Sequence, residues 1–277
     1  MKTMKVLLLV SFAIRTTEAL SQFDETPVIS SQYDQSETAL AFSPLNPNHI
    51  LAAWNQRANQ GASYSFSMDG GVTWSDNGPA PNPPYLDPSV GFDRSEKAFY
   101  CYLSGPDPYQ VYISRTTDFG EHWFEPVSIG IPAPASNDKP YMAIDNTGLG
   151  GRDGHIYVSW AVGSSLGYYK ILFRRSTNHG ESFDSSIVEL DNQDISEGDL
   201  FCFANTGSYD PNKIARPDVN FSMPVVDSQG DVFVVWAYLV GESSKYKLAK
   251  SIDGGMSFPK SFCSHINNVG DRKRNTK

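Results

Sequence analysis

The sequence is poor in charge and has no long apolar run. Only 19% of its 277 residues are charged, and 31 acidic side chains outnumber 22 basic ones, which gives a formal net charge of −9. A surface of that sign repels phosphate, so we exclude a nucleic-acid partner. No stretch is apolar for long enough to cross a bilayer as a helix, so no membrane span is expected.

Motifs that carry familiar chemistry are missing as well. The sequence has no paired-cysteine metal spacing, no phosphate-binding glycine loop and no Gly-x-Ser-x-Gly segment. Its five histidines are scattered, and no segment shows the period of an amphipathic helix. Catalytic residues therefore stay unknown, and neither a metal centre nor a cofactor is predicted.

Cysteine is scarce, with three residues in the chain. Cys101 lies within an apolar segment, which favours a buried thiol. A disulfide between Cys202 and Cys263 is left open, because spacing alone does not decide it.

The first nineteen residues have the pattern of a secretory signal peptide. Lys2 and Lys5 precede an apolar run from Val6 to Ile14, and Thr17-Glu18-Ala19 offers small residues for cleavage. This pattern predicts a signal peptide at 1–19 and a mature domain at 20–277. It predicts a secreted protein, extracellular or periplasmic.

What the chain does contain is one short pattern, Ser/Thr-x-Asp/Asn-x-Gly-x-x-Trp/Phe, written four times. The copies start at positions 67, 116, 176 and 251. Their shared residues are Asp69, Gly71 and Trp74; Asp118, Gly120 and Trp123; Asn178, Gly180 and Phe183; and Asp253, Gly255 and Phe258.

Each position of this pattern has a physical reason. We expect the Ser/Thr to end an incoming strand and the Asp/Asn to accept a backbone N–H two residues on. The Gly supplies a positive φ. The aromatic residue is expected to open the return strand and to fill space between neighbouring sheets. The pattern therefore predicts the tip of a β-hairpin.

A larger repeat surrounds each copy. Upstream lies an apolar strand ending in Trp54, Tyr102, Trp160 or Trp236, 13 to 16 residues before the Ser/Thr. A shorter strand and a turn precede it, so every unit holds four antiparallel strands. Repeats of this kind predict an all-β propeller. The blades cover about 36–84, 85–130, 137–190 and 215–262, with an insertion at 185–214.

The insertion is rich in acidic residues. It carries Asp191, Asp194, Glu197 and Asp199, without the spacing of an EF-hand. Either a solvated acidic loop or a bound Ca²⁺ fits this composition.

The fourfold pattern resembles the Asp box, or BNR repeat, of sialidase-like β-propellers. That resemblance covers about Ser36 to Phe258. It implies blades packed around a central channel, with the Asp boxes on outer hairpins away from the ligand. Sialidase-like propellers have six blades and four are visible here. The chain therefore holds an incomplete six-bladed ring, closes a four-bladed ring or associates with other chains.

The resemblance also implies a ligand site at the channel mouth, just before the first strand of each blade. Charged residues occupy those positions in all four units: Glu37; Asp87; Asp138 with Lys139; and Arg216 with Asp218. They are our candidate binding residues. The alternative is that they cap turns where strands begin.

A sialidase of this family would need three arginines that grip a carboxylate, a Tyr paired with a Glu, and an acidic Asp. The segment from Thr26 to Leu40, where the resemblance implies the first arginine, contains none. Arg115 and Arg175 directly precede Asp boxes, which indicates the outer hairpin. Tyr85 and Tyr141 lie near plausible positions for the nucleophile.

Three hypotheses follow. The first is a secreted propeller that binds a glycan or an extracellular protein without a complete sialidase catalytic set. The second is an exo-sialidase or related glycoside hydrolase acting on terminal sialic acids. The third is a structural repeat of a larger secreted assembly. Whether the chain is an enzyme, and its oligomeric state, are left open.

Overall fold

The computed structural model describes residues 28, 34–56, 61–75, 78–79, 85–164, 167–192, 218–240, 243–259 and 261–264. The predicted signal peptide, Arg216 and most of the insertion lie outside these residues. Every regular element in the described part of the chain is a β-strand. No helix long and apolar enough to span a membrane occurs there.

The strands form four sheets, and each sheet takes four strands that are consecutive in the chain. Sheet 1 contains β1 (Gln35–Phe42), β2 (Ile50–Gln56), β3 (Gly61–Ser67) and β4 (Gly78–Pro79). Sheet 2 contains β5 (Tyr85–Phe92), β6 (Ala98–Ser104), β7 (Gln110–Thr116) and β8 (Val127–Ser128). Sheet 3 contains β9 (Ser136–Ile144), β10 (Ile156–Ser164), β11 (Gly167–Ser176) and β12 (Val188–Asn192). Sheet 4 contains β13 (Asp218–Val226), β14 (Val232–Val240), β15 (Ser243–Ser251) and β16 (Ser261–Ser264).

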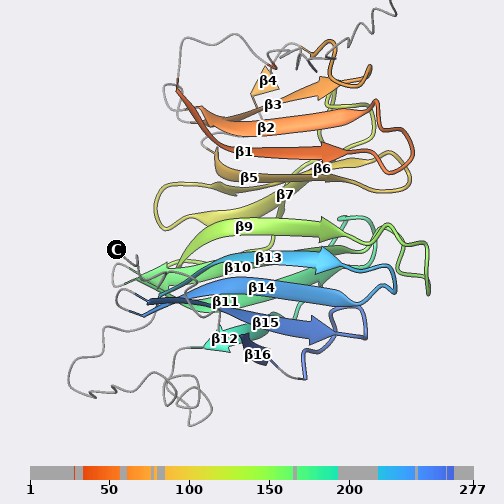
Figure 1. Ribbon diagram of the computed structural model, residues 1–277. Coiled ribbons are helices and arrows are strands. Elements are labelled where there is room, and N and C mark those ends of the chain that lie inside the picture. Colours follow the sequence, from red (N-terminus) through yellow and green to blue (C-terminus); the bar gives the residue numbers. More distant parts are fainter. Residues whose placement is uncertain are drawn as a thin grey trace, which may run out of the picture.

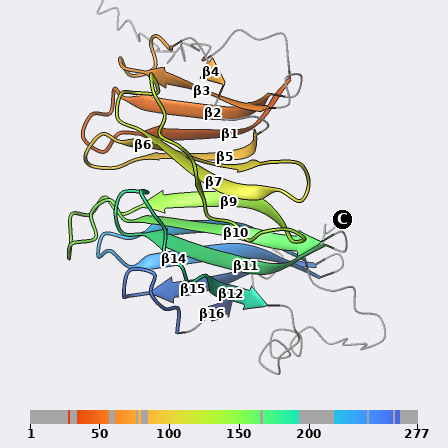
Figure 2. The ribbon, with the colours of Figure 1, turned by 180° about the vertical axis from the view of Figure 1, so that it is seen from behind.

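Neighbouring strands within each sheet are antiparallel. Figure 1 shows the first strands β1, β5, β9 and β13 in the middle of the molecule, and Figures 1 and 2 both show β4, β12 and β16 at the outside. The first strands contact one another in the order β1, β5, β9 and β13. These are the blades of a propeller, and the predicted all-β fold class is confirmed.

The core lies between the sheets. Leu51 and Tyr64 of sheet 1 pack with Phe92 and Tyr100 of sheet 2, and all four side chains are buried. A second cluster joins sheets 2 and 3, and a third joins sheets 3 and 4. A single four-stranded sheet cannot bury both of its faces, so each blade depends on its neighbours.

The inter-sheet packing has a direction. Phe92 of β5 faces the preceding sheet, as Ile144 of β9 faces its own predecessor in the second cluster. The equivalent residues of β1, Leu40 and Phe42, are 57% and 55% exposed. At the other end of the row, Val225 of β13 is 50% exposed. The first and last sheets therefore each present an apolar end face.

The four Ser/Thr-x-Asp/Asn-x-Gly-x-x-Trp/Phe segments form the same turn after the third strand of each sheet. In sheet 1 the Ser67 hydroxyl accepts the Gly71 N–H at 2.8 Å and donates to Asp69 at 2.9 Å. Asp69 Oδ1 then accepts the Thr73 N–H at 2.8 Å. The segments starting at 116, 176 and 251 repeat these bonds with distances between 2.6 and 3.0 Å.

Two details of the predicted turn were wrong. The Asp/Asn oxygen accepts a backbone N–H four residues on, because the Ser/Thr hydroxyl already takes the N–H two residues on from the Asp/Asn. The aromatic residue also does not open the return strand, since β4 begins only at Gly78, after Trp74. The predicted positive φ is confirmed, with +92° at Gly71 and +86° at Gly120.

Three of the four aromatic residues of these turns, Trp123, Phe183 and Phe258, pack between sheets, as predicted. Trp123 of sheet 2 lies 5.2 Å from Tyr64 of sheet 1, ring centre to ring centre. Phe258 of sheet 4 lies 4.9 Å from Phe173 of sheet 3. The turn glycine allows this approach, because a Cβ on Gly120 would stand 2.6 Å from Phe66 Cε2.

The insertion expected at 185–214 contributes β12 to sheet 3. Asp191 of that strand was expected either to be solvated or to bind Ca²⁺, yet it is only 6% exposed. Its carboxylate pairs with Lys247 Nζ at 3.0 Å and accepts the Trp236 indole N–H at 2.6 Å, both from sheet 4. Asp194, Glu197 and Asp199 lie outside the described residues.

Cys101 is fully buried and free, as predicted. Burial raises the pKa of its thiol, which keeps it protonated and unreactive. The open question of a Cys202–Cys263 disulfide falls outside the described part of the chain, because Cys202 is not described.

A first prediction separates backbone strain from the steric role of the turn glycines. Gly71→Ala places a Cβ at positive φ with no atom nearer than 3.8 Å, so we expect a loss of about 1 kcal/mol in unfolding free energy. Gly120→Ala adds a clash with Tyr64 and Phe66, so we expect roughly 2–3 kcal/mol more. Urea unfolding measures both variants, and equal losses would contradict the packing role.

A second prediction concerns the turn carboxylates. The backbone N–H of His122 is the main cause that lowers the pKa of Asp118 to about 2. Asp118→Ala should cost about 1 kcal/mol, whereas Asp118→Asn should retain most stability because Asn178 makes the same bonds naturally.

The ionised Asp118 stabilises the fold above its unfolded pKa of about 4, and this contribution disappears as pH falls through about 2. The difference between wild type and Asp118→Ala should therefore shrink between pH 4 and pH 2. Urea titrations at several pH values test this, and a constant difference would contradict the assignment.

Candidate functional site

The first strand of every sheet carries a bulge at the same place. The register shifts between Ser36 and Ala39 in β1, and the equivalent shift occurs in β5, β9 and β13. One residue in each bulge has a positive φ: Glu37 at 54°, Asp87 at 55°, Lys139 at 47° and Phe221 at 57°. Such angles are uncommon for residues other than glycine, and bulges redirect side chains. The bulges thus change the side-chain direction of four equivalent residues, at the same end of each first strand.

Three of these residues meet, although they come from three different sheets. Lys139 Nζ forms one ion pair with Glu37 and a second with Asp87 Oδ1 at 2.9 Å. The Asp87 side chain is 10% exposed and that of Lys139 is 19% exposed, whereas Glu37 is 40% exposed. The ammonium group therefore holds the two carboxylates together at the centre of the propeller.

Asn55, at the end of β2, completes this cluster. Its Nδ2 donates to the Glu37 carboxylate, and its Oδ1 accepts the Asp87 N–H at 3.0 Å. Asn55 is 7% exposed. Asn55 was not among the residues predicted from the sequence. The feature that could have indicated it is its place, as a polar residue directly after the apolar run that ends in Trp54.

A second polar contact joins sheets 3 and 4. Asn220 Nδ2 donates to Asp138 Oδ2 at 3.0 Å, and Asn220 Oδ1 accepts the Phe221 N–H at 2.7 Å. Asn220 is 8% exposed. It also was not predicted, although it precedes the bulge residue of its strand just as Asp138 does.

A cavity of about 770 Å³ opens between the first three sheets at this end. Its walls include Glu37, Asn55, Asp87, Asp138 and Lys139, together with Asp107 and Tyr109. Among the described residues that line it, four carry carboxylates and one, Lys139, carries a positive charge. The cavity is therefore acidic and rich in hydrogen-bond acceptors.

Contacts within this cluster shift the pKa values of Glu37 and Lys139. A hydrogen bond with Asp87 and burial raise the pKa of Glu37 above its usual value, although Lys139 opposes them. Burial works to lower the pKa of Lys139, but its hydrogen bonds to Glu37 and Asp87 outweigh burial, so the net shift is upward. Lys139 consequently stays charged at neutral pH.

Tyr141 follows Lys139 by two residues on the same strand. Burial is the main cause that raises the pKa of its phenol. A tyrosine that attacks a substrate needs activation by a base or a lowered pKa. Tyr141 has the opposite shift, and the side chain of Tyr85 is outside the described part of the chain.

Four of the six candidate binding residues thus line the cavity: Glu37, Asp87, Asp138 and Lys139. Asp218 begins β13, but its side chain is not described, and Arg216 lies outside the described residues. Arg115 and Arg175 contact the turn of the following sheet, donating to the carbonyls of Gly180 and Gly254. These two arginines hold neighbouring blades together.

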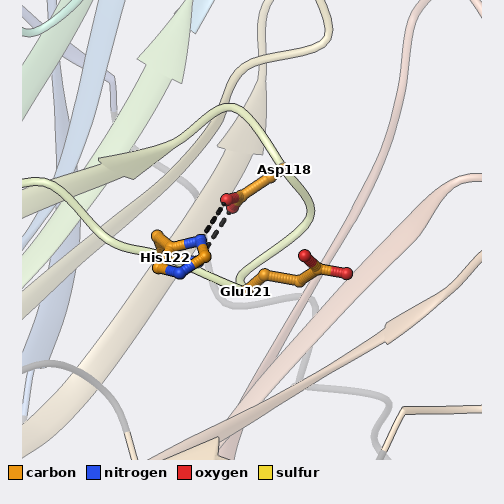
Figure 3. A group of neighbouring side chains, drawn as sticks. All are labelled: Asp118, Glu121 and His122. Carbon is orange, nitrogen blue, oxygen red and sulfur yellow. Dashed lines mark hydrogen bonds and ion pairs between the residues drawn. The ribbon is translucent and has the colours of Figure 1, made fainter.

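One group outside the cavity has donor atoms suited to a metal ion. Ligand atoms of Asp118, Glu121 and His122 lie within 4.8 Å of one another in the turn of sheet 2. Figure 3 shows the Asp118 carboxylate pointing at the His122 ring, with the Glu121 carboxylate turned to the other side. His122 Nδ1 lies 2.7 Å from Asp118 Oδ2, the contact that Thr73 makes with Asp69 in sheet 1. The proximity of Asp118 and His122 is therefore explained by the hydrogen bonding of the turn, and it does not require a metal ion.

Comparisons with known proteins are informative for the fold alone. No protein-family model matches the chain, and no sequence of a curated protein matches it. Its structure is similar to the leech intramolecular trans-sialidase, with a TM-score of 0.58 and 12% identity over 88% of this chain and 54% of that one. It is also similar to the intramolecular trans-sialidase of Ruminococcus gnavus, with a TM-score of 0.57 and 12% identity over 87% of this chain and 73% of that one.

An ulvan lyase from a polysaccharide lyase family is also similar. Its TM-score is 0.53 at 9% identity, over 88% of this chain and 60% of that one. The chain thus spans little more than half the length of the leech protein and of the lyase. At such identities the likeness establishes a sialidase-like propeller fold, and it is shared by proteins named for different reactions.

A third prediction tests the ion pairs of the cavity. Lys139→Met leaves Glu37 and Asp87 facing each other without a cation, so we expect a loss of about 1–2 kcal/mol at pH 7. This expected loss of stability is smaller than the loss on breaking a fully buried ion pair, because the Glu37 side chain is 40% exposed.

The loss should shrink as pH falls, because both carboxylates then become neutral. It should also shrink above about pH 10, where Lys139 loses its proton first in the unfolded chain and then in the folded one. Lys250→Met, which removes a more exposed pair with Asp231, is the control and should change stability by less than about 1 kcal/mol. Equal losses in urea unfolding would contradict the special role of Lys139.

Proposed function

We propose that this chain is a carbohydrate-binding propeller whose site is the acidic cavity at the centre of the blades. The observation that carries the proposal is the bulge repeated in the first strands, which gathers Glu37, Asp87 and Lys139 from three sheets around one cavity. Backbone strain of this kind clusters at functional sites. The solved structures with similar folds, named as trans-sialidases and a polysaccharide lyase, support a carbohydrate ligand.

The chemistry of the cavity favours a neutral glycan. Carboxylates and amides accept hydrogen bonds from sugar hydroxyls, and ionised acceptors form the stronger bonds. A sialic acid would bring its own carboxylate next to Glu37, Asp87, Asp107 and Asp138. Like charges in a partly buried cavity repel, so an anionic sugar binds weakly there.

The sialidase alternative finds less support at this site. A carboxylate clamp requires several free guanidinium groups. Lys139 is the one cation among the described residues that line the cavity, and it already pairs with two carboxylates. The raised pKa of Tyr141 also argues against Tyr141 as the nucleophile.

A structural role in a larger assembly is the second candidate. Exposed Leu40 and Phe42 on the first sheet, and Met223 and Val225 on the last, favour contact with further protein. The expected signal peptide supports a location outside the cytoplasm for either function. Light scattering of the purified chain distinguishes the candidates, because assembly predicts a mass that rises with concentration.

A fourth prediction tests glycan binding. On an array of neutral and sialylated glycans, the purified chain should bind neutral members, and Asp87→Asn should weaken that binding at least tenfold. Asp153→Asn, an exposed carboxylate that lies 3.8 Å from Arg94, is the matched control and should bind like the wild type.

Two results would overturn the proposal. One is binding confined to sialylated members, and the other is release of a fluorogenic leaving group from a sialic acid glycoside. Either would return the sialidase alternative to first place.

A further inference from the structure

Phe221 occupies in β13 the place that charged residues hold in the other three first strands. It lies in the same bulge, and its φ of 57° matches the values of Glu37, Asp87 and Lys139. The blade repeat therefore puts an aromatic ring where a side chain directed toward the central cavity is expected. The ring is 48% exposed.

Two energetic costs are combined at this one residue. A non-glycine residue at positive φ is strained by about 1 kcal/mol or more. An exposed phenyl ring also leaves apolar surface in water. The bond from the Phe221 N–H to Asn220 Oδ1, at 2.7 Å, stabilises this strained backbone. The same Asn220 binds Asp138, which lines the cavity. Asn220 thus connects the bulge that holds Phe221 to a residue of the polar cavity wall.

We propose that Phe221 is the stacking platform of the glycan site. The inference rests on the proposed function and names the class of ligand, a neutral hexopyranose. One face of such a ring presents C–H groups that pack on a phenyl face, while its rim presents hydroxyls. Phe221 receives the C–H face, and the carboxylate of Asp138, which is bonded to the neighbouring Asn220, receives rim hydroxyls.

A simpler explanation for the exposed ring is the apolar end face of the last sheet. Met223 lies two residues further along β13 and is also 48% exposed. If Phe221 belonged to that face alone, the two residues would respond alike. Met223 is therefore the matched control, with equal exposure on the same strand.

The experiment titrates the full chain with β-1,4-galactotetraose and with cellotetraose by calorimetry. We expect Phe221→Ala to weaken binding about tenfold, the effect of losing roughly 50 Å² of apolar contact. Phe221→Trp should stay within about threefold of the wild type, since it keeps a stacking face. Met223→Ala should bind like the wild type. In saturation-transfer NMR, irradiating aromatic protons should reach sugar C–H protons in the wild type and less so in Phe221→Ala.

The outcomes separate this inference from the proposed function. Wild-type binding that Asp87→Asn weakens and Phe221→Ala leaves unchanged overturns the platform and leaves glycan binding intact. Equal losses in Phe221→Ala and Met223→Ala also overturn it. A wild-type chain that binds neither tetrasaccharide overturns the platform together with its hexopyranose ligand, and the glycan array then decides whether the cavity binds any glycan.

Discussion

The packing of one sheet face against the next is the constraint on which the rest of this structure depends. A four-stranded sheet with apolar residues on both faces gains stability only from neighbours, and three buried clusters between sheets provide it. The turn glycines permit this approach, since a Cβ at Gly120 or Gly255 would collide with aromatic rings of the preceding sheet. The cavity follows from the same packing, because Glu37, Asp87 and Lys139 come from three sheets.

Much of the architecture was predictable from local sequence. The Ser/Thr-x-Asp/Asn-x-Gly pattern specifies a turn through hydrogen bonds between residues two and four positions apart, so the role of Asp69 or Asp253 can be predicted without knowing the fold. Reading the same repeat position in each unit also found Glu37, Asp87 and Lys139, which meet in the structure. The family attribution, the signal peptide and the binding role of these residues remain predictions.

What sequence reasoning missed depends on long-range contacts. Asn55 gains its role only because bulges bring Glu37 and Asp87 to it, and nothing in the local pattern predicts a bulge at a non-glycine residue. Asp191 appeared solvated because the loop that follows it is acidic. Its burial against Lys247 and Trp236 depends on a sheet whose strands begin more than twenty residues later. Local composition carries no information about such a partner.

The ion pair between Lys139 and Glu37 has a consequence for cooperativity. Most blade contacts join consecutive sheets, which is the pattern of a one-dimensional chain of units that can unravel from its ends. Lys139 of sheet 3 instead reaches Glu37 of sheet 1 and passes over sheet 2. Fraying of the first blade therefore breaks an ion pair of the third blade, at the wall of the cavity. The cluster that shapes the site thus also links the end of the row to its middle, so that the cavity is intact only when three blades are folded at once.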